Sequence, residues 1–81
     1  MTVKVLFFGE LKERFGKAED ILTVTDNLRV RDILPHFMPS LDQQQAWHGQ
    51  ILYAVNQVQV AADHTVRDGD EVAFMPPMTG G

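Results

Sequence analysis

Two strongly apolar segments at opposite ends of the 81-residue chain constrain its fold most. Val3 to Phe8 is β-branched and aromatic and closes at Gly9, and Glu71 to Met75 runs into the double proline Pro76-Pro77. The near-continuous apolarity of the first segment predicts a strand that is buried on much of both faces and hence central in its sheet. A first and a last strand of this kind lie most simply side by side in the middle of a mixed sheet.

After the first strand, the chain predicts a short helix and a second strand. Glu10 to Phe15 carries its acidic residues early and is followed by Gly16, where a helix C-cap favours glycine. Ile21 to Thr25 is rich in β-branched residues and is followed by the turn signal Asp26-Asn27. We expect this second strand to pair with the first one as in a hairpin.

The main helix is predicted from an apolar stripe with spacings of three and four residues, formed by Val30, Ile33, Leu34 and Phe37. Pro35 removes an intrahelical hydrogen bond unless it lies in the first turn, so the helix should begin near Arg31 or Asp32, or bend at the proline. Arg29 stands where a capping Ser or Thr is expected, and Pro39 should end the helix.

The next segments predict a short helix and a hairpin. Ser40 to Gln43 has the spacing of a capping box, and Gly49 can close the helical segment that follows it. Ile51 to Val55 and Val58 to Val60 flank Asn56-Gln57, which has the length of a two-residue hairpin turn, and Asn tolerates a positive φ. Two antiparallel strands are therefore expected here.

Together the elements predict an α+β protein with a β-grasp (ubiquitin-like) arrangement: a mixed sheet with one main helix across one face. Asp63 to Thr65 is expected to be a loop, and Gly69 to turn the chain into the last strand. Residues 1–75 would form the β-grasp domain, and residues 76–81 an extended C-terminal tail that ends in Gly-Gly. A chain of this length has room for one core and no deep pocket.

Composition excludes several classes of function. The formal net charge of −4 argues against binding to nucleic acid or to an anionic membrane surface, and favours a partner with a basic face. The absence of cysteine excludes disulfides, thiolate metal sites and a cysteine nucleophile. The N-terminal apolar run is too short for a membrane span and lacks the layout of a signal peptide, so we expect a cytoplasmic protein.

The polar residues do not predict a metal or catalytic site. His36, His48 and His64 lack metal-ligand spacing, so we expect surface histidines and no metal ligands among them. The acidic cluster from Asp68 to Glu71 lacks the spread of ligands of a calcium loop, so a solvated turn is favoured, with contact to basic residues of a partner as the other interpretation. Any nucleotide chemistry should therefore take place on another protein.

The C-terminal tail carries the one candidate reactive group. Pro76-Pro77 should stop the last strand and project the following residues as a semi-rigid arm. Gly80-Gly81 has no side chains and can lie in a narrow channel, which leaves the α-carboxylate as the reactive group. Ordering such a tail costs about 1–2 kcal/mol per residue, which a partner must offset. The alternative is an ordinary frayed terminus.

Large apolar residues close to the tail allow two interpretations. Phe7, Phe74, Met75 and Met78 would by default belong to the core. A sheet covered by a helix on one face leaves its other face free, however, and alternation must send some side chains of the strands to that face. Apolar residues there would mark a docking patch beside the tail, and Met75 has an equal claim to either face.

Five stretches of the chain resemble the family of sulfur-carrier small subunits of molybdopterin synthase. They are Val5 to Leu11, Ala54 to Gln57, Asp68 to Phe74, Pro76-Pro77 and Thr79 to Gly81. The similarity spans essentially the whole chain. Met75 departs from the pattern, because the family often has a second aromatic residue at that position.

The resemblance implies a β-grasp fold and a reaction cycle. An ATP-dependent adenylyltransferase of the ubiquitin-activating type, which uses ATP and Mg, adenylates the C-terminal glycine, and a sulfur donor enzyme converts the adenylate to a thiocarboxylate. The tail then enters the large subunit of molybdopterin synthase, where two sulfurs pass to cyclic pyranopterin monophosphate to make the dithiolene. The chain would thus be no enzyme on its own but one subunit of a heterotetramer with two small and two large subunits, without a permanently bound cofactor.

The resemblance also implies roles for single residues. Gly81 would carry the sulfur and Gly80 would permit insertion into the partner. Pro76, Pro77 and Thr79 would set the reach of the tail and seat it through backbone contacts, beside Met78. Phe7 and Phe74 would belong to the strands against which the large subunit docks, and Met75 would belong to the patch that contacts this partner.

Other functions fit the same fold and tail. A sulfur carrier for thiamine or another thiolated product is one alternative, although the proline pair and the Asp-Gly-Asp-Glu block favour the first pathway. A ubiquitin-like modifier, whose tail forms amide bonds to lysines, is an alternative of a different class. A purely structural interaction domain would tolerate the loss of Gly80-Gly81.

Overall fold

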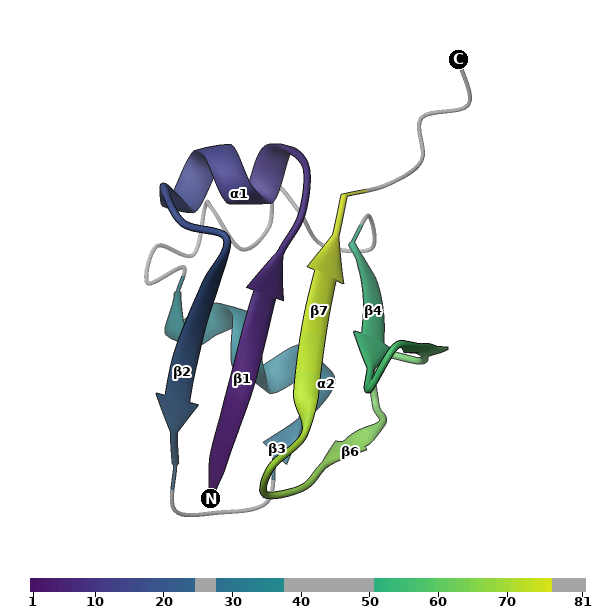
Figure 1. Cartoon of the computed structure of the whole chain (residues 1–81). Helices are drawn as coiled ribbons and strands as arrows, with labels where there is room; N and C mark the ends of the chain where they lie inside the picture. Colours follow the sequence, from purple (N-terminus) through teal and green to yellow (C-terminus); the bar gives the residue numbers. More distant parts are fainter. Residues whose placement is uncertain (25–27, 38–50, 77–81) are drawn as a thin grey trace.

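The computed structural model describes residues 1–24, 28–37 and 51–76 (Figure 1). The elements in chain order are β1 (Thr2–Phe7), α1 (Glu10–Phe15), β2 (Glu19–Thr23), β3 (Leu28–Arg29), α2 (Val30–Ile33), the 3-10 helix η1 (Leu34–His36), β4 (Leu52–Val55), β5 (Val58–Val60), β6 (Thr65–Val66) and β7 (Glu71–Met75). The turn Asp26-Asn27, the helix predicted after Ser40, and residues 77–81 lie outside the described residues.

The main sheet is mixed and has the strand order β2-β1-β7-β4-β5. β1 and β7 are parallel, with Phe7 opposite Phe74, whereas β2 and β4 are antiparallel to their central neighbours. Figure 1 shows β1 and β7 side by side in the middle of the sheet, with α2 behind them. The predicted central pair and the predicted β-grasp arrangement are therefore confirmed.

The core lies between the sheet and the helices. Alternate residues of the central strands are fully buried, together with one residue of α1 and the apolar stripe of α2: Val3, Val5, Phe7, Leu11, Val30, Ile33, Val72 and Phe74. The ring of Phe7 lies 4.7 Å from that of Phe15 and 5.1 Å from that of Phe37, between centroids. These aromatic contacts join α1, β1 and the end of the main helix into one core.

The main helix is short and changes from an α-helix to a 3-10 helix at Leu34, directly before Pro35. α2 begins at Val30, one residue before the predicted start, and continues as the 3-10 helix η1. The carboxylate of Asp32 accepts a hydrogen bond of 3.1 Å from the backbone N–H of Arg29. The N–H groups of Val30 and Arg31 donate to the carbonyls of residues 64 and 62. Because these groups already have partners, the helix needs no Ser or Thr as its N-cap.

Two glycine and turn predictions are confirmed. Gly16 ends α1 in the left-handed conformation, with φ of 70°. Asn56 and Gln57 both have positive φ, 52° and 71°, and join β4 to β5 in a tight hairpin.

Some strands depart from the prediction. β2 begins and ends two residues earlier than predicted. The short sheet formed by β3 and β6 was not predicted, because two-residue strands have no periodicity to detect.

Candidate functional site

The candidate site begins where β7 ends, at Pro76. Figure 1 shows this end of β7 beside the connection between β1 and α1. The tail residues to which the sequence assigns chemistry and seating, which are Pro77, Met78, Thr79, Gly80 and Gly81, lie outside the described residues. The structure therefore defines the base from which this tail starts.

The connection between β1 and α1 forms one side of this base. The N–H of Phe8 donates a hydrogen bond of 3.2 Å to the carbonyl of Phe74, which extends the pairing of β1 and β7 by one step. Gly9 follows with φ of 57° and ψ of −130°, a conformation that residues with a side chain rarely adopt. A β-carbon on Gly9 would lie only 2.8 Å from Cγ of Pro76. The segment that follows β1 and the segment that follows β7 thus meet closely at the site.

The face of the sheet opposite α2 carries an apolar surface that reaches the site. Alternate residues of β1, β4 and β7 point to this face, here named the open face: Leu6, Leu52, Ala54, Ala73 and Met75. Ala54 is buried, and the other four are half-buried. Phe8, just past β1, is 46% exposed. A contiguous apolar surface of this kind is typical of a protein-binding surface.

Phe7 and Phe74 were predicted to contact a partner, but the structure places both in the core. Their side chains are 1% and 0% exposed, and their rings stack at 6.2 Å between centroids. Their neighbours Phe8 and Met75 are the side chains that reach the surface here. Met75 lies on the open face, opposite Leu52, which decides between the two positions that the sequence left equal.

The acidic cluster between β6 and β7 is bonded to the backbone. Asp68 accepts a hydrogen bond of 2.7 Å from the N–H of Thr2. Asp70 accepts one of 3.0 Å from the side-chain amide of Asn56, whose oxygen accepts one of 3.0 Å from the N–H of Glu71. Asp68 is exposed, as predicted for a solvated turn, whereas Asp70 and Glu71 are half-buried, and these hydrogen bonds hold the start of β7. Sequence reasoning missed this role, because the bonded residues lie far apart in the chain.

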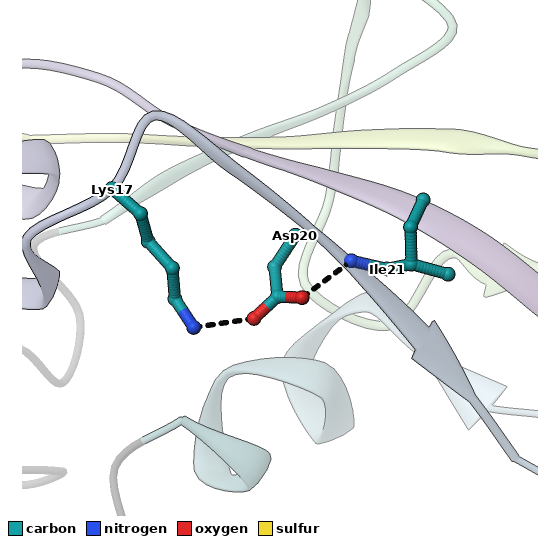
Figure 2. Close-up of polar contacts among 3 residues, drawn as sticks. All are labelled: Lys17, Asp20 and Ile21. Atoms are coloured by element: carbon teal, nitrogen blue, oxygen red, sulfur yellow. Dashed lines mark hydrogen bonds and ion pairs between the residues drawn. The ribbon is translucent and has the colours of Figure 1, made fainter.

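A second polar contact holds the start of β2. Figure 2 shows the carboxylate of Asp20 between the ammonium group of Lys17 and the backbone N–H of Ile21, which donates at 2.7 Å. The hydrogen bond from Lys17 and the one from Ile21 lower the pKa of Asp20 below its ordinary value of 3.8. The ammonium group of Lys17 also lies 5.4 Å from the centre of the Phe37 ring. The pair therefore ties β2 to the edge of the core.

No further chemical site is found in the described parts of the chain. Among residues 1–24, 28–37 and 51–76, no three His, Asp or Glu side chains gather closely enough to hold a metal ion. In the same residues, no helix is long and apolar enough to cross a membrane.

The sheet order, the single main helix behind the sheet and the tail at the end of β7 define a small ubiquitin-like protein of the β-grasp fold. More narrowly, the chain belongs to the ThiS family, whose model matches residues 5–81.

Curated relatives match the chain over its full length. It is 40% identical over 84 residues to the molybdopterin synthase sulfur carrier subunit of Escherichia coli (strain K12), with 98% of this chain and 99% of the relative covered. It is 33% identical over 86 residues to the molybdopterin synthase sulfur carrier subunit of Chlamydomonas reinhardtii, with both chains covered completely. The resemblance stated from the sequence is thereby confirmed.

Solved structures agree with the fold. SAMP1 from Haloferax volcanii has a TM-score of 0.78 at 24% identity, with complete coverage of both chains. A chain of the complex of subunits 1 and 2 of the molybdopterin-converting factor from Helicobacter pylori 26695 has a TM-score of 0.65 at 22% identity, also with complete coverage. At these identities the two structures support the β-grasp fold alone.

Proposed function

We propose that this chain is the sulfur carrier subunit of a molybdopterin synthase and that Gly81 carries the sulfur as a C-terminal thiocarboxylate. The observation that carries the proposal is the 40% identity, over nearly the full length of both chains, to a molybdopterin synthase sulfur carrier subunit. The Gly-Gly end of the chain and the base at Pro76 are consistent with it.

The chemistry needs two steps on the carboxylate of Gly81. A carboxylate oxygen attacks the α-phosphorus of ATP, pyrophosphate leaves, and a mixed anhydride with AMP forms. A hydrosulfide equivalent from a sulfur donor enzyme then attacks the acyl carbon, and AMP leaves with one of the original carboxylate oxygens. The activating adenylyltransferase would supply the nucleotide site and the Mg. The chain itself would therefore need no permanently bound cofactor.

Delivery of the sulfur requires a second partner. The thiocarboxylate sulfur is a nucleophile on a tail with glycines at its end, and it would attack a carbon of cyclic pyranopterin monophosphate within the large subunit, where a carbon–oxygen bond breaks and the oxygen leaves with phosphate or as water. Hydrolysis of the acyl link would then leave the sulfur on the pterin and return the carboxylate of Gly81 for another cycle. Because the dithiolene contains two sulfurs, two carriers in the thiocarboxylate form would be used for each molecule of product. The assembly would contain two small and two large subunits.

The open face is the surface that we propose for contact with the large subunit. Its apolar residues Leu6, Leu52, Ala73 and Met75 are half-buried in the free chain and lie next to the base of the tail. Docking here would bury them and place the tail at the same interface. The complex of subunits 1 and 2 from Helicobacter pylori provides a precedent for such a pair. We expect these partners, and thus the cycle, in the cytoplasm.

A ubiquitin-like protein modifier is the second candidate. It is favoured by the similarity in fold to SAMP1, because a solved relative of this type is named small archaeal modifier protein 1. A modifier would form an amide bond between Gly81 and a lysine of another protein. A carrier for thiamine synthesis would use the same thiocarboxylate but a different acceptor.

The intact mass of the full chain tests these functions directly. The protein is incubated with ATP, magnesium, a sulfide source and the cognate activating enzyme. We expect a gain of about 16 Da, as sulfur replaces one carboxylate oxygen in the activated acyl group. Transfer of that sulfur to cyclic pyranopterin monophosphate by the large subunit would separate the proposed pathway from thiamine synthesis. A ladder of covalent conjugates without the mass gain would favour the modifier instead.

A further inference from the structure

Gly9, just after β1, and Pro76, just after β7, lie in close contact. A β-carbon added to Gly9 would lie 2.8 Å from Cγ of Pro76 and 3.4 Å from its Cδ. The ring atoms of proline are fixed to the backbone, so Pro76 cannot rotate away as a flexible side chain could. Only a glycine leaves room for this ring at position 9.

The backbone around Gly9 is held in place from both sides. The carbonyl of Gly9 accepts hydrogen bonds of 3.1 Å and 3.4 Å from the N–H groups of Lys12 and Glu13 in α1. The N–H of Phe8 donates to β7 at the carbonyl of Phe74. Any shift of Gly9 away from Pro76 would strain these bonds to α1 and β7. Gly9 is therefore a fixed seat for the proline ring.

The proline pair restricts the direction in which the backbone leaves this seat. The ring of Pro76 fixes its own φ near −65°, and Pro77 restricts the ψ of Pro76 to extended values. With both angles restricted, the position of the Pro76 ring determines the direction in which the chain continues. The five residues after Pro76 can span at most about 17 Å. A displacement of the ring therefore shifts the point from which the remaining residues start toward the partner.

We propose that Gly9 is a positioning residue for the chemistry at Gly81, which acts by seating the ring of Pro76. The proposal rests on the proposed sulfur-carrier function, in which the carboxylate must reach a reactive site on a partner. A carboxylate that starts from a fixed base needs less ordering when the partner binds it. Gly9 itself contacts neither the carboxylate nor the sulfur.

A matched pair of glycine variants separates the seat from backbone strain. Gly9→Ala adds a methyl group against Pro76, whereas Gly16→Ala adds one at a positive φ of 70° with nothing within 4 Å. We expect Gly9→Ala to lower the kcat of thiocarboxylate formation by about ten- to a hundredfold, as misplaced reacting groups do. The KM of the activating enzyme for the carrier should change little in both variants, because neither substitution removes a side chain from the surface of the carrier. Equal kcat values for the two variants would overturn the proposal.

A double-mutant cycle tests the contact itself. Pro76→Ala removes Cγ and Cδ of the ring and makes room for the added methyl group. The fold-decrease in kcat caused by Gly9→Ala should therefore be about ten times smaller in the Pro76→Ala background than in the wild-type background, because the two residues are in contact. The same factor in both backgrounds would contradict a seat. The melting temperature of each variant is measured in parallel, so that loss of fold is recognised.

An NMR measurement keeps the test independent of sulfur chemistry and of variant folding. In the unaltered full chain, nuclear Overhauser effects should join the Hα protons of Gly9 to the ring protons of Pro76. Their absence would refute the seat even if the chain carries sulfur. If they are present but the unaltered chain gains no mass with its activating enzyme, the proposed function fails while the contact stands, and a role of Gly9 in that chemistry fails with it.

Discussion

The two ends of β7 are held in different ways. At its start, polar side chains hold the strand: Asp68 accepts a hydrogen bond from the N–H of Thr2, and Asn56 accepts one from the N–H of Glu71 and donates one to Asp70. At its end, the contacts are apolar and close, with Phe74 in the core and Pro76 against Gly9. The start of β7 thus fixes the position of the strand, whereas its end forms the base of the tail. Variants at the two ends should accordingly affect different properties.

The largest effect is expected from the deletion of Gly81, beyond the apolar end. It should abolish thiocarboxylate formation, because the reactive carboxylate is moved by one residue and its glycine is lost. The melting temperature should not change, since the core of the described residues ends at Phe74. Intact-mass analysis and thermal unfolding measure the two properties. A truncated protein that still supported synthase activity would contradict the assignment of Gly81.

The neighbours Phe74 and Met75 test whether the apolar end is divided between core and surface. Phe74→Ala should destabilise the domain by about 3–5 kcal/mol, since it removes a fully buried ring. Met75→Ala lies on the open face and should cost about 1 kcal/mol or less. Urea unfolding gives both values.

Binding to the large subunit tests whether the surface residue at this end of β7 contacts a partner. Met75→Ala should weaken the affinity for the large subunit by about tenfold, if Met75 is a central contact of the interface. Calorimetric titration with the large subunit measures this, with Val58→Ala on β5 as a control, because Val58 is exposed and lies opposite Val55, away from the open face. A larger loss of stability for Met75→Ala than for Phe74→Ala would reverse the assigned faces.

The polar end should affect stability more than activity. Asn56→Ala removes two hydrogen bonds and places alanine at a φ of 52°, for an expected loss of about 1–3 kcal/mol. Asn56→Gly removes the same bonds but accepts the positive φ, so its loss should be smaller. Thiocarboxylate formation by the folded fraction should stay unchanged in both. If activity fell before stability did, the separation between the two ends would be wrong.

The smallest effect is expected at Asp20, which lies outside both ends of β7. Its pKa is lowered by the hydrogen bond from Lys17, so the pair stabilises the fold above about pH 3.8, the ordinary value, and this contribution is lost as the pH falls through the lower value of the folded state. Lys17→Met should raise the pKa of Asp20 in a carbon-13 NMR titration. Lys4→Met, with the same change of charge, should leave it unaltered.

Most elements of the fold were predicted from local patterns. Gly16 as a helix C-cap, Asn56-Gln57 as a turn and Glu71 to Met75 as the last strand are all properties of neighbouring residues, and the structure confirms each of them. The site was predicted less completely. Pro76 was recognised from the sequence, whereas Gly9 was recognised only as the end of a strand, because its contact lies at the other end of the chain.

The sequence by itself determined which residues alternate along each strand, where the turns lie and which group can react at the C-terminus. These depend on side chains within a few positions of one another. Only the tertiary structure decided which face of β7 is covered, and hence that Phe74 is core and Met75 is surface. It also brought Asp68 to Thr2 and Pro76 to Gly9. The physical reason is that the alternation of side chains along a strand shows which residues share a face but not which face is buried. The buried face is the one on which a helix from a distant part of the sequence packs.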